Sequence, residues 1–372
     1  MDANTDISPF RIEIPQADLD DLADRLGKVR WTNELPGAGT DYGVPLEEVK
    51  TLVEYWRERF DWRAVEAELN SHRQFGTEID GQNIHFVHVR SPEPDATPLI
   101  LTHGWPSSFV EYLDFIGPLT DPRAHGGDPA DAFHVVIPSI PGFGFSGPTN
   151  EKGWNRYRIA AAWAELMRRL GYHRYGAHGN DAGSLIAPEV GRVDPDRVIG
   201  VHVTQIFSFP SGDPAEFEGM SEEDMAKLRF LQWFWENMGA YNKLQSSAPQ
   251  TLAHALSDSP VGQLAWSSQL IGSLDPDAVL TNVMIYWLTN TAASSARLYY
   301  EDAHAGEPNE PTTVPIGLAN FANDFQSIRR FAERDHQNIA SWNTYDSGSH
   351  WATYEVPDLV IDDIRAFFRK FR

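Results

Sequence analysis

Residues 179–183, with the sequence GNDAG, decide the fold of this chain. A short apolar run at residues 175–177 precedes them, and a helix-like run at 184–190 follows. A strand, a glycine-flanked tight turn and a helix form a nucleophile elbow, whose usual sequence is G-x-S-x-G. The central residue of an elbow has a strained backbone, so its neighbours carry almost no side chain. Taken alone, the pentapeptide also fits an ordinary solvated turn, and the rest of the chain has to separate the two interpretations.

Asp181 occupies the central position of this elbow, where serine is usual. A serine alkoxide attacks acyl carbon, whereas a carboxylate is a good nucleophile toward a saturated carbon that bears a leaving group or belongs to a strained ring. Attack by Asp181 would need three further parts: an oxyanion site, a general base with an orienting acid, and a group that activates the leaving atom.

The composition is that of an acidic globular chain of 372 residues, long enough for one large core with an accessory segment or for two to three domains. The formal net charge of −23 argues against a nucleic acid or an anionic membrane as partner, because both attract clustered Lys and Arg. The chain has no cysteine, which excludes disulfides, thiolate metal sites and cysteine nucleophiles. Residues 1–9 lack the features of a signal peptide, and no apolar run reaches the roughly 18 residues of a membrane-spanning helix. We therefore expect a cytoplasmic protein that needs no membrane.

Residues 1–95 are predicted to form an N-terminal region of their own. Their pattern predicts a strand, two amphipathic helices and a hairpin turned by Asp80 and Gly81, in that order: residues 10–14, 19–26, 46–56 and 75–89.

Residues 96–206 and 302–372 alternate strands with helices, which predicts a mostly parallel sheet covered by helices. The expected strands are residues 98–102, 133–137, 175–177, 198–203, 312–316 and 339–345, and the expected helices include residues 159–170 and 359–368. Residues 207–301 are rich in Trp, Ser, Pro and Met and are predicted to be helical. Such an insertion predicts a lid over the carboxyl edge of the sheet, although a helical subdomain that closes nothing would show the same pattern.

The sequence HGWP at residues 103–106 directly follows the first of these core strands and is the candidate oxyanion loop. In an elbow enzyme, the oxyanion donors are the backbone N–H after the nucleophile and one from the loop after an earlier strand. These positions are Ala182 and Trp105. Whether the bond before Pro106 is cis is left open by the sequence.

A histidine is the expected base, because imidazole takes and returns a proton near neutral pH. The chain order of elbow enzymes, which is nucleophile, acid, histidine, favours His350 over His304 and His336 in their polar stretches. The acid is expected after a strand that ends near residue 317. Asp324 fits this place, at the predicted start of a helix, where N-capping would be its ordinary role. The weaker alternatives, each displaced from that loop, are Asp335 and Asp346.

Residues 142–147 (GFGFSG) fit the dinucleotide-binding pattern G-x-G-x-x-G, but Pro148 interrupts the helix that the pattern requires. We expect instead a loop that shapes the floor of the pocket. No H-E-x-x-H or comparable ligand spacing occurs, so neither a dinucleotide nor a metal is expected as cofactor.

With these motifs in place, the chain resembles the microsomal-type epoxide hydrolases of the α/β-hydrolase superfamily over nearly its whole length. The most specific segments are residues 103–109, 179–186, 256–262, 281–287 and 315–317. The resemblance implies an α/β-hydrolase fold with a mostly parallel sheet, a helical lid and an N-terminal extension. It also implies that an epoxide is converted to a vicinal diol without a cofactor, with Asp181 as nucleophile, His350 as base and Asp324 as orienting acid.

The resemblance further implies two lid tyrosines, Tyr241 and Tyr299, as donors to the epoxide oxygen. An opening epoxide develops alkoxide charge, which a phenol in a dry site stabilises. Tyr300 is adjacent to Tyr299 and points elsewhere if this segment is helical.

The chain departs from the family pattern at two positions. Ala182 stands where many members have Trp, which predicts a roomier pocket, and Asp324 stands where Glu is more common, which shortens the reach to His350. The membrane anchor of the microsomal enzyme is also missing, so we expect a soluble protein similar to bacterial members. Detoxification and natural-product biosynthesis are both hypotheses for its role, and a homodimer is left open.

Two alternatives use the same fold. A haloalkane or haloacid dehalogenase would share the aspartate nucleophile, and a noncatalytic ligand-binding protein would use neither base nor acid. Ala182 and the paired tyrosines favour the epoxide over the halide, because halide sites need N–H donors such as indole groups near the leaving atom.

Overall fold

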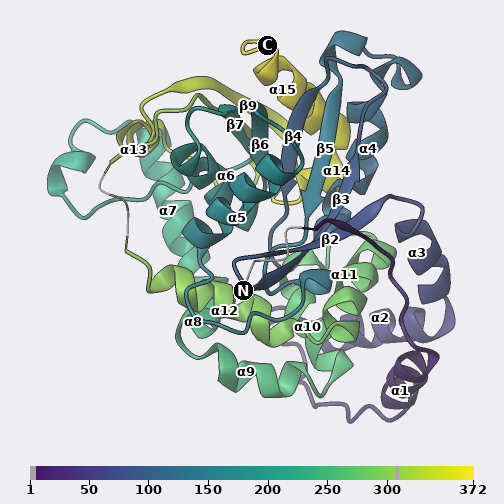
Figure 1. Ribbon diagram of the computed structural model, residues 1–372. Helices are drawn as coiled ribbons and strands as arrows, with labels where there is room; N and C mark the ends of the chain where they lie inside the picture. Colours follow the sequence, from purple (N-terminus) through teal and green to yellow (C-terminus); the bar gives the residue numbers. More distant parts are fainter. Residues whose placement is uncertain (1–5, 307, 309) are drawn as a thin grey trace.

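A nine-stranded sheet organises the computed structural model, which describes residues 6–306, 308 and 310–372 (Figure 1). The strand order is β1-β2-β3-β5-β4-β6-β7-β8-β9, antiparallel from β1 to β5 and parallel from β5 to β9. In chain order the strands are β1 (Ser8–Phe10), β2 (Gln74–Ile79), β3 (Gln82–Val89), β4 (Thr97–Thr102), β5 (Phe133–Pro138), β6 (Tyr175–Gly179), β7 (Val198–Val203), β8 (Ile316–Asn323) and β9 (Ile339–Ser349). The first five residues of the predicted N-terminal region lie outside the described residues.

Helices cover both faces of the sheet and one of its ends. They are α1 (Gln16–Gly27), α2 (Leu46–Glu58), α3 (Trp62–Leu69), α4 (Leu113–Thr120), α5 (Arg156–Arg169), α6 (Ala182–Val193), α7 (Glu222–Asn237), α8 (Ala240–Ser247), α9 (Pro249–Leu256), α10 (Pro260–Ile271), α11 (Pro276–Leu288), α12 (Ala292–Ala303), α13 (Arg329–Asp335), α14 (Ala352–Glu355) and α15 (Pro357–Phe368). None of the helices in the described part of the chain has the length and apolar character needed to cross a lipid bilayer.

The N-terminal region contains the predicted helices and hairpin, and a third helix, α3. The hairpin turns at Asp80 and Gly81, whose φ angles of 52° and 72° belong to the tight two-residue turn that such a pair favours. The prediction of a strand at residues 10–14 was wrong, because β1 ends at Phe10. Beyond it, the N–H groups of Ile12 and Ile14 donate to the side chains of Asn70 and Glu66, at 2.9 and 2.7 Å, instead of to a neighbouring strand.

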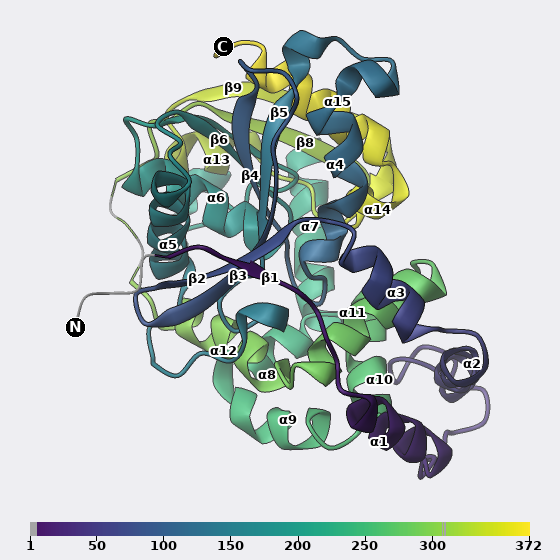
Figure 2. The ribbon, with the colours of Figure 1, turned by 45° about the vertical axis from the view of Figure 1, so that its right-hand side comes forward.

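The core strands alternate their side chains between two helical layers. Leu99 and Leu101 of β4 belong to the cluster that includes α4 and α15, whereas Ile100 packs in the cluster with α5 and α6. Figure 2 shows α5 and α6 on one side of the sheet and α4, α14 and α15 on the other. Burial on both faces explains why these strands are continuous apolar runs in the sequence.

Between β7 and β8 the described residues form helices and no strand. Helices α8 to α12 gather at one end of the sheet, beside α1 to α3, in both views (Figures 1 and 2). Helices α1 and α2 contact α10, and α2 also contacts α11, so the N-terminal region supports the inserted helices from outside. The domain boundaries themselves stay predictions.

The strand predicted at residues 312–316 was wrong, and so was the helix predicted to begin at Asp324. Thr312 forms only an isolated bridge to His336, while β8 begins at Ile316 and continues to Asn323. The strand was hard to predict because it contains the polar residue Asn320. In the structure Asn320 is buried, and its amide bonds to the Gln326 side chain. The next helix, α13, begins only at Arg329.

Candidate active site

The elbow forms at the carboxyl end of β6, where Asp181 stands between the strand and α6. Its φ of 52° and ψ of −118° are a conformation that a residue with a side chain adopts only when its surroundings enforce it. Two glycines permit the turn. A Cβ atom on Gly179 would lie 2.0 Å from the Gly183 carbonyl oxygen, and one on Gly183 would lie 1.9 Å from the Thr102 carbonyl oxygen.

Five neighbouring parallel strands bring the site together, because the carboxyl ends of parallel strands meet at one edge of a sheet. Each of these strands is followed within a few residues by one side chain or backbone group of the site: Trp105 after β4, Asp181 after β6, Gln205 after β7, Asp324 after β8 and His350 after β9.

His350 lies between two carboxylates. Its Nε2 atom is 3.2 Å from Asp181 Oδ2, and its Nδ1 atom is 2.8 Å from Asp324 Oδ1. The backbone N–H of Phe325 also donates to Asp324 Oδ1, at 2.6 Å. Asp324 directly follows β8 and caps no helix. Its carboxylate is therefore free of a capping role and bonds to the imidazole. The structure therefore brings the predicted nucleophile, base and acid into one chain of hydrogen bonds.

The surroundings of His350 and Asp181 favour a positive charge on the imidazole and a negative charge on the carboxylate. Burial lowers the pKa of His350, but the two carboxylates outweigh it and hold this pKa well above its ordinary value. Burial raises the pKa of Asp181, but the imidazole and two backbone N–H groups outweigh it and lower this pKa. Both shifts favour the ionised form of the pair, an imidazolium beside a carboxylate.

The other oxygen of Asp181 faces backbone donors. The Trp105 N–H donates to Asp181 Oδ1 at 2.8 Å, and the N–H of Ala182 also bonds to this carboxylate. These are the two positions that the sequence predicts as oxyanion donors. The Trp105–Pro106 peptide bond is cis.

The two predicted tyrosines lie together beside the Trp105 ring, with 6.0 Å between their own ring centroids. Tyr241 of α8 stacks on the indole with 5.5 Å between ring centroids, and Tyr299 of α12 meets it edge-on at 5.8 Å. Burial and the charge of Asp181 raise the pKa of both phenols, so they stay protonated and able to donate. Tyr300 points away, as expected for a helix: it is 37% exposed and stacks on His304.

A cavity of about 290 Å³ opens above Asp181 and His350. Its walls are mostly aromatic and come from the segment after β7, from α7 and from the loop after β8: Phe207, Phe209, Phe230, Phe234, Trp235 and Phe325. Phe207 and Phe325 stack on each other at 5.4 Å. Most of the exposed lining is apolar, and the polar groups include Asp181, Asp324 and His350, so this cavity suits a largely apolar ligand.

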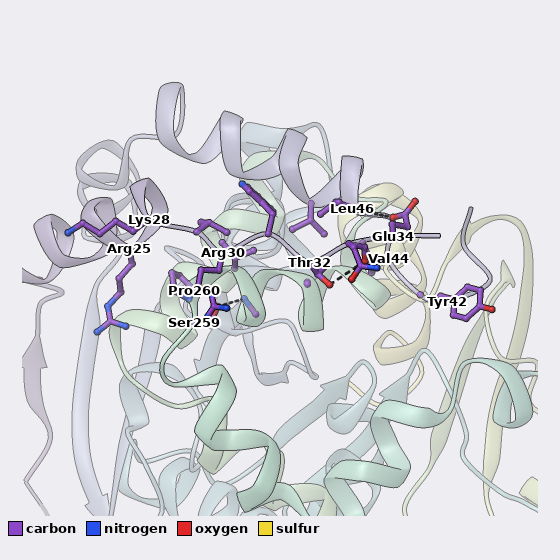
Figure 3. Close-up of a pocket in the computed structure, with 18 of the residues that line it drawn as sticks. Arg25, Lys28, Arg30, Thr32, Glu34, Tyr42, Val44, Leu46, Ser259 and Pro260 are labelled. Atoms are coloured by element: carbon purple, nitrogen blue, oxygen red, sulfur yellow. Dashed lines mark hydrogen bonds between the residues drawn. The ribbon is translucent and has the colours of Figure 1, made fainter. Parts of the chain in front are cut away.

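A larger cavity, of about 810 Å³, lies between the loop after α1 and the start of α10 (Figure 3). Neither Asp181 nor His350 lines it. Two of its cations are paired with carboxylates on the surface, Arg25 with Asp21 and Asp258, and Lys28 with Asp24. Size alone therefore does not mark it as a reaction site, and we place the chemistry in the smaller cavity.

Sequence reasoning missed a buried polar network beneath the elbow. Gln205 contacts both Asp181 and Asp324, and Asn180 donates to Glu111 at 2.9 Å. Burial raises the pKa of Glu111 to about 7, and Thr353 also donates to it. The position of Gln205 just after β7, on the edge that carries the elbow, was the available signal.

The weaker candidates lie elsewhere. His304 bonds to the Tyr300 carbonyl, His336 bonds to Thr312, Asp335 pairs with Arg334, and Asp346 is exposed. In the described part of the chain, no group of three or more His, Asp or Glu side chains is placed to hold a metal ion.

The prediction that residues 142–147 shape the pocket floor was wrong. None of them lines the cavity above Asp181. A Cβ atom on Gly142 would lie 3.1 Å from the Ser294 carbonyl oxygen, and the Ser294 hydroxyl donates to the Gly142 carbonyl. The glycines therefore allow this loop to approach α12 closely, which anchors the helix that carries Tyr299.

Comparison with known proteins agrees with this fold. Residues 7–112 match the family model for the epoxide hydrolase N terminus, and residues 97–261 match the model for the alpha/beta hydrolase fold. The chain is 42% identical to a Stigmatella aurantiaca protein with a provisional epoxide hydrolase name, over 98% of this chain and 86% of that one. It is 33% identical to epoxide hydrolase 1 of Sus scrofa, over 97% and 88%. The crystal structure of juvenile hormone epoxide hydrolase from Bombyx mori superposes with a TM-score of 0.91 at 25% identity, covering 100% of this chain and 96% of that one.

The sheet, its helical layers and the matching fold model place the protein in the α/β-hydrolase class. Relatives that share a third or more of its residues over almost the whole chain then narrow the class. The chain belongs to the epoxide hydrolase family and is a hydrolase.

Proposed function

We propose that the protein hydrolyses an epoxide to a vicinal diol through an ester formed on Asp181. One observation carries the proposal: the two oxygens of this carboxylate have different partners. Oδ1 is held by the Trp105 N–H, while Oδ2 faces the imidazole of His350 at the floor of an apolar cavity. Oδ2 is thus the oxygen that can bond to carbon while Oδ1 remains among its donors.

In the first half-reaction, Asp181 Oδ2 attacks a ring carbon and the bond from that carbon to the epoxide oxygen breaks. Negative charge develops on the departing oxygen, the phenols of Tyr241 and Tyr299 donate hydrogen bonds to it, and one phenol gives it a proton. That phenol regains a proton as the imidazolium of His350 loses one, so no net charge is gained or lost in the site. The product is a hydroxyalkyl ester on the enzyme.

In the second half-reaction, His350 removes a proton from water, which attacks the carbonyl carbon of the ester. The N–H groups of Trp105 and Ala182 hold the charge that forms on Oδ1. The bond between the carbonyl carbon and Oδ2 then breaks, and the diol leaves with Oδ2 and with the second proton of the water. A carboxylate beside an imidazolium is thereby restored. Asp324 orients the imidazole through Nδ1.

Ester formation also prepares the base. Asp181 is one of the two carboxylates that raise the pKa of His350. Once this carboxylate is esterified it has no charge, so the pKa of His350 falls. The neutral imidazole that the second half-reaction needs is therefore favoured only after the first half-reaction has taken place.

A single turnover in water enriched in oxygen-18 tests the scheme. Because water attacks the ester carbonyl, we expect the heavy oxygen in the peptide that contains Asp181 and ordinary oxygen in the first diol formed. The readout is peptide mass spectrometry, with Asp181→Asn as the unlabelled control. Heavy oxygen found in the diol and never in the peptide would show that water opens the epoxide directly.

The aromatic cavity supports an epoxide with a large apolar substituent. We expect a styrene-oxide-like substrate to have a higher kcat/KM than a small aliphatic epoxide, because the rings of the cavity bury more apolar surface on it. The reverse order would contradict this substrate class while leaving the ester mechanism untouched.

A further inference from the structure

Gln205 lies between the elbow of Asp181 and the loop of Asp324, just beyond the end of a strand. It follows β7, and β7 lies between β6, which carries the nucleophile, and β8, which carries the acid. Its side chain is fully buried between the elbow and the loop of Asp324. Its side chain does not line the cavity above Asp181, and its polar atoms bond to protein groups instead.

The amide of Gln205 bonds both to the elbow of Asp181 and to the carboxylate of Asp324. Its Oε1 atom accepts from the Asp181 backbone N–H at 2.9 Å, and its Nε2 atom donates to Asp324 Oδ2 at 2.5 Å. Further hydrogen bonds come from the Ser184 and Thr204 hydroxyls to Oε1, and go from Nε2 to Asn180. Both halves of the amide are therefore engaged.

Only one orientation of this amide satisfies its neighbours. A backbone N–H can only donate, so the carbonyl oxygen must face Asp181. An ionised carboxylate can only accept, so the NH₂ group must face Asp324. Glutamine provides an acceptor and a donor at this reach, whereas a carboxylate or an apolar side chain of similar size provides one or neither.

The contact with Asp324 determines how that carboxylate is turned. Oδ1 accepts from His350 and from the Phe325 backbone, and Oδ2 accepts from Gln205. Without the amide, Oδ2 would be a buried acceptor with no partner in this network, and the carboxylate would gain by rotating toward other donors. Rotation would take Oδ1 away from the imidazole that it orients.

We propose that Gln205 is a positioning residue, which holds the Asp324 carboxylate against His350 and thereby controls the water-activating step. The inference rests on the proposed function, because it assigns His350 and Asp324 to hydrolysis of the ester. Gln205 acts through these two residues and reaches no reacting atom itself.

The test uses Gln205→Met, which keeps the size of the side chain and removes both polar atoms. Rapid mixing with a styrene-oxide-like epoxide, followed by acid quench and mass analysis, measures formation and loss of the ester separately. We expect hydrolysis of the ester to slow by about 10- to 100-fold, the size of effect expected when a hydrogen bond to a buried charged group is lost. Ester formation should slow by less, so the esterified enzyme accumulates.

A second variant gives a readout that packing alone would not change. In Gln205→Glu, the introduced carboxyl can donate to Asp324 only while it is protonated. Its ester hydrolysis should therefore recover toward the wild-type rate as the pH falls, whereas that of Gln205→Met should show no such recovery. The matched control is Gln74→Met, which removes another buried glutamine that bonds to His85 and to the Leu69 carbonyl, far along the sheet.

Several outcomes would overturn the positioning role. Equal slowing of both half-reactions, no slowing of either, or identical pH profiles for the two variants would each do so. So would loss of folding in Gln205→Met under conditions where Gln74→Met folds, because Gln205 would then be a structural residue. Failure of the wild-type enzyme to form any ester on Asp181 is a separate result, which would overturn the proposed function instead.

Discussion

The two oxygens of Asp181 show how much a single residue depends on its neighbours. The side chain is the same as in any surface aspartate, but its backbone is held at φ 52° and its oxygens are divided between a backbone N–H and an imidazole. Steric exclusion by two glycines places the carboxylate, and long-range contacts give each oxygen a separate task.

The lid tyrosines allow a prediction at this scale. Tyr241→Phe or Tyr299→Phe should slow ester formation by about 100-fold, because each removes one donor from the developing alkoxide. Hydrolysis of an ester already formed should be little changed. Single-turnover mass analysis resolves the two half-reactions.

Tyr300→Phe is the matched control for these variants, since this phenol lies on the outer side of α12 and should not affect either step. Wild-type rates of ester formation in the Tyr241→Phe, Tyr299→Phe and combined variants would show that the phenols only pack in the lid.

Residues differ in how readily the sequence reveals them. Asp181 is marked by its flanking glycines, and His350 by its place after the last strand. Gln205 has no local signal, because its importance comes from two partners in different strands. Asp324 was found by chain order although its local structure was mispredicted.

At the scale of elements, α7 is unusual. None of its 16 residues is buried, although it carries several large apolar side chains. Five residues on α7 or just after it line the cavity above the nucleophile: Phe230, Leu231, Phe234, Trp235 and Met238. Four apolar side chains on the helix itself therefore face the cavity.

This arrangement predicts different effects on binding and on stability. Phe234→Ala should raise KM for a bulky apolar epoxide about 10-fold, because part of the wall that contacts the substrate is lost. The free energy of unfolding should change by only about 1 kcal/mol, since the ring is partly buried at the edge of the core instead of inside it. Steady-state kinetics and urea titration measure the two effects.

Trp233→Ala serves as the control on the same helix, because Trp233 is 50% exposed and does not line this cavity. An equal rise in KM for both variants, or a large loss of stability in Phe234→Ala, would contradict the assignment of α7 as a substrate wall.

Elements with a clear periodicity were predictable, including α2, the β2–β3 hairpin and α15. Strand β8 was not, because it contains asparagines that look like loop residues. Its pairing with β7 and β9 makes it a strand, and those neighbours are remote in the sequence.

At the scale of the whole molecule, buried histidines link stability to pH. Burial lowers the pKa of His85 to about 3, that of His103 to about 4, and that of His178 well below its ordinary value. The unfolded chain binds more protons than the folded one below the ordinary histidine pKa, so stability falls as the pH falls. Each of these three histidines should lower the free energy of unfolding by about 1 kcal/mol as the pH falls from about 7 to about 5.5.

Glu111 and His350 oppose this trend, because their pKa values are raised and folding then favours their protonated forms. The pKa values of His88 and His336 are also lowered to about 4. The groups that lose stability therefore outnumber Glu111 and His350, and the net effect should be a loss of stability over the same pH range. Urea unfolding at the two pH values measures it. Stability that stays constant or rises toward acid would show that these histidines are not held neutral in the folded protein.

The predictions of a cytoplasmic protein, of detoxification or natural-product biosynthesis, and of the domain boundaries remain predictions. The family is established by comparison over nearly the whole chain.

The sequence by itself determined the elbow, the hairpin, the alternation of strands and helices, and the chain order of the proposed nucleophile, acid and base. These features depend on steric limits and on periodicity within short segments, and both can be recognised directly from the residue types. Only the tertiary structure decided how the carboxylate oxygens are divided, where β8 runs, which face α7 presents and what Gln205 holds. Each of these depends on hydrogen bonds or packing between segments that meet at the edge of the sheet, and such contacts exist only after the parallel strands have paired.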